Sequence, residues 1–483
     1  MLPIGHAFEN FYHHYSEEIE REVAAVFVGA GLSIPGGYSN WKTLLQPIAD
    51  ELGLDIEKES DLISLAQYKV NMDRNRGRVT RLLVEEFAKD ARISENHRLI
   101  ASLPIHTLWT TNYDKLLEDA YREAHKILDT KVKIENLTLT KPGRDAVLYK
   151  MHGDKDDPTE TVLTKEDYET FHLSRGFFTE MLKGDLIAKT FLFLGFSFTD
   201  PNIDFILSRI RPLLGQNVKT HYCIMRQPQK CGNKGAAKAD YEYECRKLAL
   251  RIEDLKRYGI QTLLIDDFGQ ITEILGELKK RTHVKSIFVS GSAHDFSPLG
   301  REQIEKLARL IGLNIIKHGY NLTSGFGLGI GGAIIIGAME QIYQDINSKT
   351  SDRISLRPFP QTPPQGIPRA ELWTRYRIEM IENVGFTIFI CGNKLDTDTN
   401  QLIPATGMRE EFEISKSLGK YPIPIGASGS VAKEIWDEVM ASPGKFYKNI
   451  DVNKELQVLG DQSKSIEDFV EAIFAIIRKV SGK

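Results

Sequence analysis

This chain has little of what a cross-linked or membrane-spanning protein needs. Four cysteines among 483 residues are too few for a disulfide framework, so we expect a reducing, cytoplasmic location. The longest apolar stretches, 190–198 and 333–339, fall far short of the roughly 20 residues that span a bilayer. The N-terminus has no basic segment followed by an apolar one. We therefore expect no secretion signal and no membrane partner.

Strong charge of one sign is also missing. The net charge is −4, and no basic tail or stripe appears. Nucleic-acid binding usually depends on such a basic surface, so we expect no nucleic-acid partner. An anionic ligand has to be met by a few local groups instead. The length allows two or three domains, and the hydrophobic content of 41% is ordinary for a globular protein.

Apolar segments that are typical of buried strands alternate with amphipathic helical segments along the whole chain. This pattern predicts an α/β protein with two Rossmann-like, doubly wound domains, 1–283 and 284–483. In the first domain we expect strands at 24–28, 107–110, 146–151, 190–194, 221–225 and 261–265, with helix-rich inserts at 54–106 and 159–189. In the second we expect a first strand from 286 that ends in a turn at 290–292, and further strands at 321–324, 354–358, 386–391 and 421–425. The proline-rich residues 358–368 predict a mobile loop.

Three short motifs follow apolar strands in the first domain. They are Gly29-Ala30-Gly31-Leu32-Ser33, then Asn112 with Asp114, and then His152 with Gly153. The carboxyl ends of parallel strands meet at the sheet edge where ligand crevices form. A glycine turn there lets backbone N–H groups approach a pyrophosphate at a helix N-terminus. The motifs therefore indicate a dinucleotide site.

Each of these residues also has a purely structural interpretation. Asn112 or Ser33 could cap a helix, and Asp114 could hold its loop rather than contact a ligand. A lone His152 would more often be a hydrogen-bonded structural histidine, but its position after Asn112 and the glycine turn favours catalysis. The other histidines of this domain lack such a context, and we expect structural roles for them: His97, His106 and His221.

The order and spacing of these motifs resemble the sirtuin (SIR2) family, which binds NAD+ and cleaves its nicotinamide–ribose bond. Gly195-Phe196-Ser197-Phe198-Thr199-Asp200-Pro201 looks like the family's Gly-x-Ser segment beside the adenosine ribose. The resemblance implies catalytic roles for Asn112 and His152. It implies NAD+ contacts at Gly29, Ala30, Gly31, Ser33, Asp114, Gly195 and Ser197.

The four-cysteine zinc ribbon of protein-deacylating sirtuins is absent from the expected place. No cysteine lies between His152 and Gly195, and the later Cys223, Cys231 and Cys245 lack C-x-x-C spacing. We therefore expect no metal, and a hydrolase that turns NAD+ into ADP-ribose and nicotinamide. A sirtuin-type deacylase and a nucleotide-binding regulator without turnover remain the alternatives.

The second domain carries two glycine-containing turns, Ser290-Gly291-Ser292 and Gly325-Phe326-Gly327-Leu328-Gly329. It resembles the SLOG branch of Rossmann-like folds. Residues 391–396 lack the glycine pair and glutamate of the related phosphoribohydrolases, which favours a sensor over a second enzyme. The resemblance implies signal contacts at Ser290, Gly291, Gly325, Gly327, Arg377, Lys394 and Glu411. For Arg377 and Glu411 the structural alternative is a solvated helix face.

A SIR2 domain followed by a SLOG domain resembles the effector family of the Thoeris anti-phage defence system. In that family a TIR-domain partner makes a cyclic ADP-ribose isomer of the glyco-cyclic, 3′cADPR type. The isomer binds the SLOG domain, and the SIR2 domain then depletes cellular NAD+. The resemblance also implies a homotetramer held through the SIR2 domains.

Overall fold

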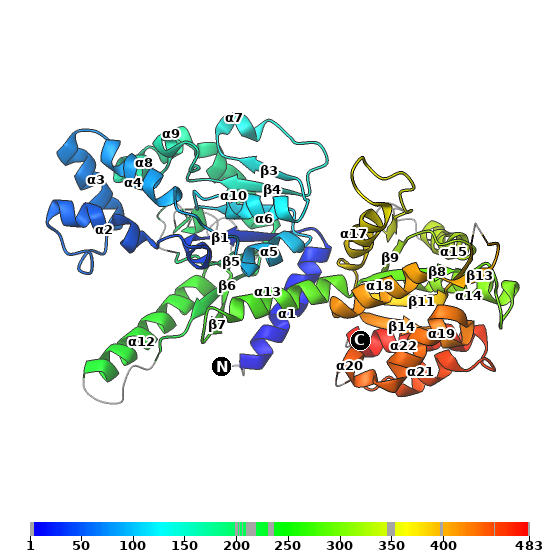
Figure 1. Ribbon diagram of the computed structural model, residues 1–483. Coiled ribbons are helices and arrows are strands. Elements are labelled where there is room, and N and C mark those ends of the chain that lie inside the picture. Colours follow the sequence, from blue (N-terminus) through cyan, green and yellow to red (C-terminus); the bar gives the residue numbers. More distant parts are fainter. Residues whose placement is uncertain are drawn as a thin grey trace. The chain divides into compact units, whose positions relative to one another are not determined.

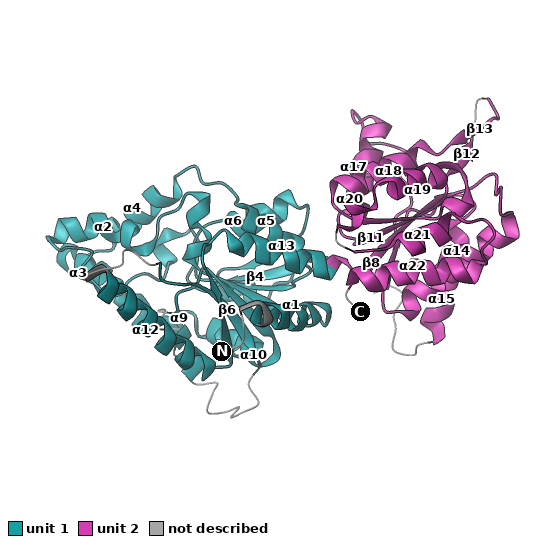
Figure 2. Ribbon diagram, turned by 90° about the horizontal axis from the view of Figure 1, so that it is seen from below, with its two compact units in different colours: residues 1–282 teal, residues 283–483 magenta. Residues whose placement is uncertain are grey.

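The computed structural model describes residues 4–198, 201, 203–204, 206–208, 219–229, 236–344, 353–396, 399–448 and 450–481 (Figure 1). The chain divides into two compact units, 1–282 and 283–483 (Figure 2). Each unit has a parallel sheet covered by helices, which confirms the predicted α/β class. Within the described ranges no helix is long and apolar enough to cross a membrane.

The first unit is built on a seven-stranded sheet in the order β3-β4-β2-β1-β5-β6-β7. Its strands are β1 (Ala24–Val28), β2 (Thr107–Thr110), β3 (Leu128–Lys131), β4 (Ala146–Lys150), β5 (Thr190–Leu194), β6 (His221–Arg226) and β7 (Ile260–Ile265). From β1 the chain first builds one side of the sheet, and it builds the other side from β5 onward. The strand order therefore reverses between β1 and β5, the place where open α/β sheets form ligand crevices.

Alternating side chains of β1 build a core on each face of this sheet. Val26 and Val28 pack with α1 (Ile4–Glu20), α5 (Glu95–Ser102), α6 (Leu116–Glu123) and α13 (Gln270–His283). Ala25 and Phe27 pack on the opposite face with α10 (Gly176–Ala188). The first unit also contains α7 (Ile134–Leu137), α8 (Lys165–Glu169), α9 (Phe171–Ser174) and α12 (Ala236–Lys256). Because both faces are covered, the central strands read as unbroken apolar runs.

The helical insert that follows β1 has a core of its own. It consists of α2 (Trp41–Leu52), α3 (Leu62–Asp73) and α4 (Gly77–Phe87), and its core includes Tyr113 and Leu163 from the main body. Tyr113 Oη also donates a hydrogen bond to the Val162 carbonyl, at 2.6 Å. Tyr113 therefore joins the insert to the loops that follow β2 and β4.

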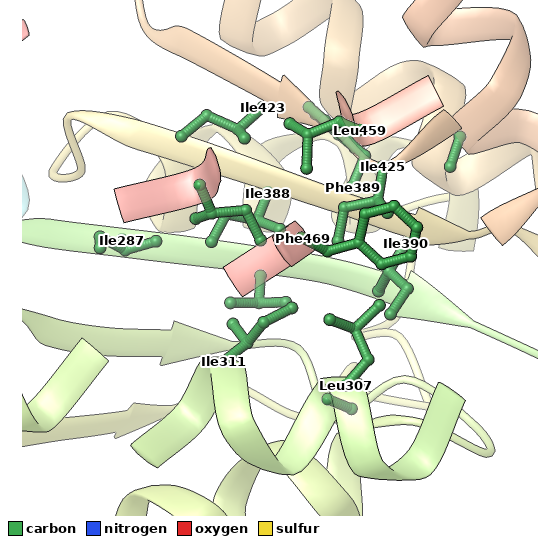
Figure 3. Close-up of a cluster of buried hydrophobic side chains, with 14 of the residues drawn as sticks. Ile287, Leu307, Ile311, Ile388, Phe389, Ile390, Ile423, Ile425, Leu459 and Phe469 are labelled. Atoms are coloured by element: carbon green, nitrogen blue, oxygen red, sulfur yellow. The ribbon is translucent and has the colours of Figure 1, made fainter. Parts of the chain in front are cut away.

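The second unit has five parallel strands in the order β10-β9-β8-β11-β14. They are β8 (Ser286–Ser292), β9 (Asn321–Ser324), β10 (Ile354–Leu356), β11 (Phe386–Cys391) and β14 (Tyr421–Pro424). Figure 3 shows Ile287 and Ile388 of the sheet packed with Ile311 of α14 (Arg301–Lys317) and Phe469 of α22 (Ile466–Ser481). Phe288 packs on the other face with α17 (Arg369–Ile381). The remaining helices are α15 (Gly331–Gln344), α18 (Thr406–Ser417), α19 (Ser430–Ala441), α20 (Pro443–Tyr447) and α21 (Asn453–Gly460).

Some short elements differ from the sequence prediction. The edge strand β3, the hairpin of β12 (Asn393–Leu395) and β13 (Leu402–Pro404), and helices α20 and α21 were not predicted. The strand expected at 354–358 ends at Leu356. These are short elements whose residues lack a long apolar pattern.

Candidate functional site

The glycine turn after β1 differs from the expected start of an α-helix. Residues Ala30–Leu32 and Ile34–Gly36 form two 3₁₀ turns, η1 and η2, and Pro35 stands at the first turn of the second. The Gly29 N–H donates to the Leu194 carbonyl and the Gly31 N–H donates to the Gly195 carbonyl, each at 2.9 Å. These two N–H groups therefore already have partners in the strand and loop at the end of β5.

The glycines at this turn are required by close backbone packing. A Cβ at Gly29 or Gly31 would lie 2.5 or 2.9 Å from the Gly195 oxygen. Gly195 has a φ of +62°, and a Cβ there would lie 2.4 Å from the Leu32 nitrogen. The loops after β1 and β5 thus interlock at the point where the strand order reverses. Ala30 is half-buried beside them, and Ser197 is exposed.

Asn112 is held by two hydrogen bonds from its amide nitrogen. Nδ2 donates to the Gly29 carbonyl at 3.0 Å and to Ser33 Oγ at 2.9 Å. A carbonyl only accepts hydrogen bonds, so this contact fixes which end of the amide is nitrogen. The amide oxygen Oδ1 is buried and has no hydrogen-bond partner among the described residues. It is therefore a buried acceptor to which no described residue donates.

Ser33 and Asp114 complete this network. Ser33 Oγ donates to Asp114 Oδ2 at 2.7 Å and makes no side-chain capping bond to η2, so the capping interpretation is wrong. Asp114 Oδ1 accepts from the Leu116 N–H at 3.0 Å at the start of α6. Asp114 is buried and holds its loop, as one of its two interpretations expected. The network fixes the Asn112 amide through its nitrogen end.

His152 lies two residues beyond the end of β4 and is 1% exposed. Tyr168 and Phe171 meet its ring edge-to-face, with ring centroids 5.6 and 5.9 Å away. The His152 carbonyl accepts from the Val162 N–H at 2.9 Å, and Gly153 has a φ of +98°. The imidazole is therefore held in an aromatic setting by a tight loop.

The register of the sheet brings Asn112 and His152 to the same level. Thr110 of β2 pairs with Lys150 of β4 in the parallel ladder, and each site residue follows two positions later. Neighbouring strands lie about 4.8 Å apart. Two of the aromatic residues at this edge, Tyr168 and Phe171, also line a cavity of about 720 Å³ together with Phe177 and Lys183.

A buried charge cluster was missed by sequence reasoning. Lys150 is 0% exposed at the end of β4, and its ammonium contacts Glu118 and Asp154. Burial raises the pKa of the Glu118 carboxyl. Burial acts in the same direction on Asp154, but the charge of Lys150 and hydrogen bonds from Lys150 and Lys115 outweigh it and lower the pKa. The available signal was a lysine closing an otherwise apolar strand.

Two predicted structural histidines of the first unit are buried, whereas His106 is exposed and bonds the Asp145 carbonyl. Burial lowers the pKa of His97 and of His221 to about 4. His97 Nδ1 bonds Ser94 Oγ, and His221 Nδ1 accepts from the Phe191 N–H. Thr199, Asp200 and Cys231 lie outside the described residues. Within the described ranges no group of three or more His, Cys, Asp or Glu side chains could hold a metal ion.

In the second unit the glycine loop also packs on backbone. A Cβ at Gly327 would lie 1.7 Å from the Gly291 oxygen, and one at Gly325 would lie 3.1 Å from the Phe359 ring. The Ala293 N–H donates to the Leu328 carbonyl at 2.9 Å. The loop after β9 is thus fixed against the end of β8.

Three predicted signal contacts of this unit form one buried network. Ser290 Oγ donates to Glu411 Oε2 at 2.5 Å, and Arg377 Nε lies 3.4 Å from Glu411 Oε1. Arg377 and Glu411 are each 7% exposed, so the solvated-face interpretation is wrong for both. Burial raises the pKa of Glu411 to about 7, against the lowering effect of Ser290 and Arg377.

Aromatic rings cover the Arg377 guanidinium, whose centre lies 4.9 Å from the Phe359 ring and 5.9 Å from the Trp373 ring. Arg377 Nη1 also bonds Glu410 at 2.7 Å. Lys394 is exposed on the β12–β13 hairpin. The arrangement offers a cation with planar neighbours, which suits a phosphate attached to an aromatic base.

Comparison with known proteins agrees with this architecture. The SIR2-like domain family matches residues 106–251, and the Sir2- and TIR-associating SLOG family matches residues 270–480. The first match includes Asn112, His152 and Gly195 but begins after the glycine turn. Fold and site thus define a protein with a SIR2-like domain followed by a SLOG domain.

Relatives that match over most of their length identify the family of the chain more closely. It is 41% identical over 477 residues to "NAD(+) hydrolase ThsA" of Bacillus cereus (strain MSX-D12), covering 98% of each chain. It is 44% identical over 437 residues to the protein of that name from Acinetobacter baumannii (strain 532279), covering 90% of each. The ThsA of Cytobacillus dafuensis is 41% identical over 470 residues, with 96% of this chain and 94% of the relative covered. This chain belongs to the ThsA family.

Proposed function

We propose that this chain is an NAD+ hydrolase that releases nicotinamide and ADP-ribose. The observation that carries the proposal is its 41–44% identity, over nearly the whole length, to proteins named NAD(+) hydrolase ThsA. The first unit is the hydrolase domain in this proposal, and the second is the nucleotide sensor. NAD+ is the substrate, and the reaction needs no metal from the protein.

The chemistry follows from the bond that breaks. Nicotinamide leaves a cationic N-glycoside as a neutral ring, so the ribose passes through an oxocarbenium-like state. Oriented polar groups in a site that excludes water favour this charge redistribution. The buried Oδ1 acceptor of Asn112 supports a role in orienting a ribose hydroxyl or the attacking water. That hydroxyl or water has to lose a proton during the reaction. An imidazole, with an ordinary pKa of about 6.5, can accept this proton, and we assign the role to His152.

The contacts to NAD+ divide into two sets in this proposal. Asn112 and His152 act at the glycosidic bond, and Ser33 and Asp114 hold the Asn112 amide. The loops containing Gly29, Ala30, Gly31, Gly195 and Ser197 supply the rest of the NAD+ surface. Their backbone packing supports a role in shaping that surface.

The second unit binds a cyclic ADP-ribose isomer in this proposal. Arg377 meets a phosphate, Lys394 adds a point charge, and Glu411 and Ser290 accept or donate hydrogen bonds at ribose or base. Gly291, Gly325 and Gly327 let the ligand approach the backbone. Burial of Arg377 beside Ser290 and Glu411 supports this assignment.

The family name and the SLOG match support a role in Thoeris anti-phage defence. A TIR-domain protein makes the signal there, and the activated hydrolase depletes NAD+ in the cytoplasm. The signal shifts an equilibrium between inactive and active states only by its differential affinity for them. We expect the chain to work as a homotetramer.

One assay tests the proposal. Purified full-length chain is mixed with NAD+, and nicotinamide and ADP-ribose are quantified with and without cyclic ADP-ribose isomers or an acyl-lysine peptide. We expect both products without peptide, and faster release with one isomer. Release that requires the peptide would identify a deacylase instead, and no release under any condition would identify a regulator without turnover.

A further inference from the structure

Lys150 joins the Asn112 loop to the His152 loop through a side chain that is fully buried. Its Nζ lies 3.2 Å from the Tyr113 carbonyl oxygen and 2.5 Å from the Asp114 carbonyl oxygen. Both carbonyls belong to the loop that carries Asn112. The same Nζ lies 2.5 Å from Asp154 Oδ2, in the loop that carries His152. One buried ammonium therefore spans the two loops.

The buried position of Lys150 costs desolvation free energy, so a contribution to stability does not by itself explain the residue. The side chain is 0% exposed, and Asp154 is 3% exposed. A buried ion pair loses much of its Coulombic gain to desolvation, and well-packed apolar residues often serve stability equally well. What an apolar side chain cannot do is hydrogen-bond two loop carbonyls and a carboxylate at once. The geometry thus points to a requirement for fixed loop spacing.

We propose that Lys150 is a positioning residue for NAD+ hydrolysis, which sets the distance between the Asn112 amide and the His152 imidazole. The inference rests on the proposed function. Asn112 lies next to the two carbonyls that Lys150 binds, and His152 lies two residues after Lys150 and two before Asp154. The Lys155 N–H still joins the loops at the Tyr113 carbonyl, at 2.8 Å, so loss of the ammonium changes their spacing at Asp114 and Asp154 without removing any group that contacts the substrate.

The test uses the full chain in the condition where it hydrolyses NAD+, and it compares kcat with KM. Lys150→Met should lower kcat on the order of 10²-fold, because small misplacements of reacting groups have effects of that size. KM should change little, since the loops that form the NAD+ surface stay in place. Lys115→Met is the comparison variant: Lys115 also links the Asn112 loop to the Asp154 carboxylate, at 2.9 Å, but from a partly exposed position where water can replace its ammonium. It should keep most of the parental kcat.

Stability is separated from positioning by a neutral variant. Lys150→Met leaves Glu118 and Asp154 without their buried cation and with only the partly exposed Lys115 near them, so its unfolding temperature should fall. The triple variant Lys150→Met, Glu118→Gln, Asp154→Asn removes those charges with little change in volume and should regain stability. Its kcat should stay low, because the Asp114 carbonyl and residue 154 are still not joined by the Lys150 ammonium.

The outcomes are distinct. A low kcat in the triple variant, with a restored unfolding temperature, supports the proposal. Recovery of kcat together with stability would show a purely structural lysine and overturn it. An isosteric Asp154→Asn variant, which keeps both carbonyl contacts, provides a folded intermediate and should lose less kcat than Lys150→Met. A parental chain without NAD+ hydrolysis would contradict the proposed function itself, before any variant is compared.

Discussion

Both units place a buried serine–carboxylate pair near the carboxyl edge of a parallel sheet, but they surround it differently. In the first unit Ser33 Oγ donates to Asp114 at 2.7 Å, and the neutral amide of Asn112 donates to the same Ser33 oxygen. In the second unit Ser290 Oγ donates to Glu411 at 2.5 Å, and the guanidinium of Arg377 pairs with the same Glu411 carboxylate. The same hydroxyl–carboxylate contact thus orients an amide in one unit and a cation in the other.

This difference agrees with two separate tasks. A neutral amide and an imidazole can act on a glycosidic bond without adding fixed charge beside it. A guanidinium beside aromatic rings is suited to hold a phosphate and does no chemistry of its own. The comparison predicts that variants of the first pair change turnover and variants of the second change the response to signal.

The largest expected effect is on the reacting groups of the first unit. Asn112→Ala and His152→Ala should each reduce NAD+ hydrolysis on the order of 10³-fold, because each removes a group that acts on the reacting atoms. His106→Ala, which changes an exposed histidine of the same unit, should leave the rate unchanged. Nicotinamide release by the folded variants is the measurement. Full activity in both variants would refute these roles.

The next effect concerns Arg377. Arg377→Ala should raise the concentration of cyclic ADP-ribose isomer needed for half-maximal activation on the order of 10²-fold, since it removes a buried partner of a charged ligand. Arg377→Lys should not restore the response, because an ammonium lacks the planar fork. Arg375→Ala, on the exposed side of the same helix, is the control. An unchanged dose response in Arg377→Ala would break the comparison.

Smaller effects, on different quantities, are expected when Ser33 and Ser290 are replaced. Ser33→Ala should lower kcat about 10-fold, because the Asn112 amide loses one of its two fixing contacts. Ser290→Ala should leave kcat of the activated enzyme unchanged and weaken the signal about 10-fold. Steady-state kinetics at several signal concentrations measure both quantities. If either serine changed both quantities equally, the division of tasks between the units would be wrong.

The smallest effect is an opposite pH dependence of stability in the two units. Burial lowers the pKa of His97 and of His221 to about 4, so the unfolded first unit binds protons more readily. Its stability should fall as the pH drops from about 6.5 towards about 4. Burial raises the pKa of Glu411 to about 7, so the folded second unit holds that proton more tightly. This contribution should be lost as the pH rises from about 4.5 to about 7.

Hydrogen exchange measured separately for the two units, at about pH 5 and about pH 7, checks this contrast after correction for intrinsic exchange rates. Glu411→Gln should remove the Glu411 contribution from the second unit, and His221→Gln should reduce the acid sensitivity of the first. Parallel trends that neither variant alters would contradict the assigned causes.

Much of the fold follows from apolar periodicity. Strands β1, β2, β5 and β11 have the predicted bounds, since both faces of a parallel sheet are buried and the runs are unbroken. The turn predicted at 290–292 is instead the last part of β8, where those residues pair with β11. The edge strand β3 contains Asp129 and Lys131, whose side chains form an ion pair at 2.9 Å, so it reads as a loop. Its partner strand, rather than its composition, makes it a strand.

The sequence predicted where the site lies in the sheet, but not the hydrogen-bond partners and burial of its residues. The motifs placed Asn112 and His152 after the carboxyl ends of strands, and the structure shows that these two strands are neighbours in the sheet. They did not reveal that the Gly29 and Gly31 N–H groups bond the loop after β5, because that partner lies far away in sequence. Burial of Lys150 and Arg377 was equally hidden, since such residues are buried only where distant partners meet them.

A structure of the His152→Ala variant with NAD+ bound tests the central claim most directly. The account predicts that the nicotinamide ribose lies within hydrogen-bond distance of the Asn112 amide oxygen, with its anomeric carbon facing the space left by the imidazole. NAD+ bound away from the ends of β2 and β4, with Asn112 still contacting only Gly29 and Ser33, would contradict it.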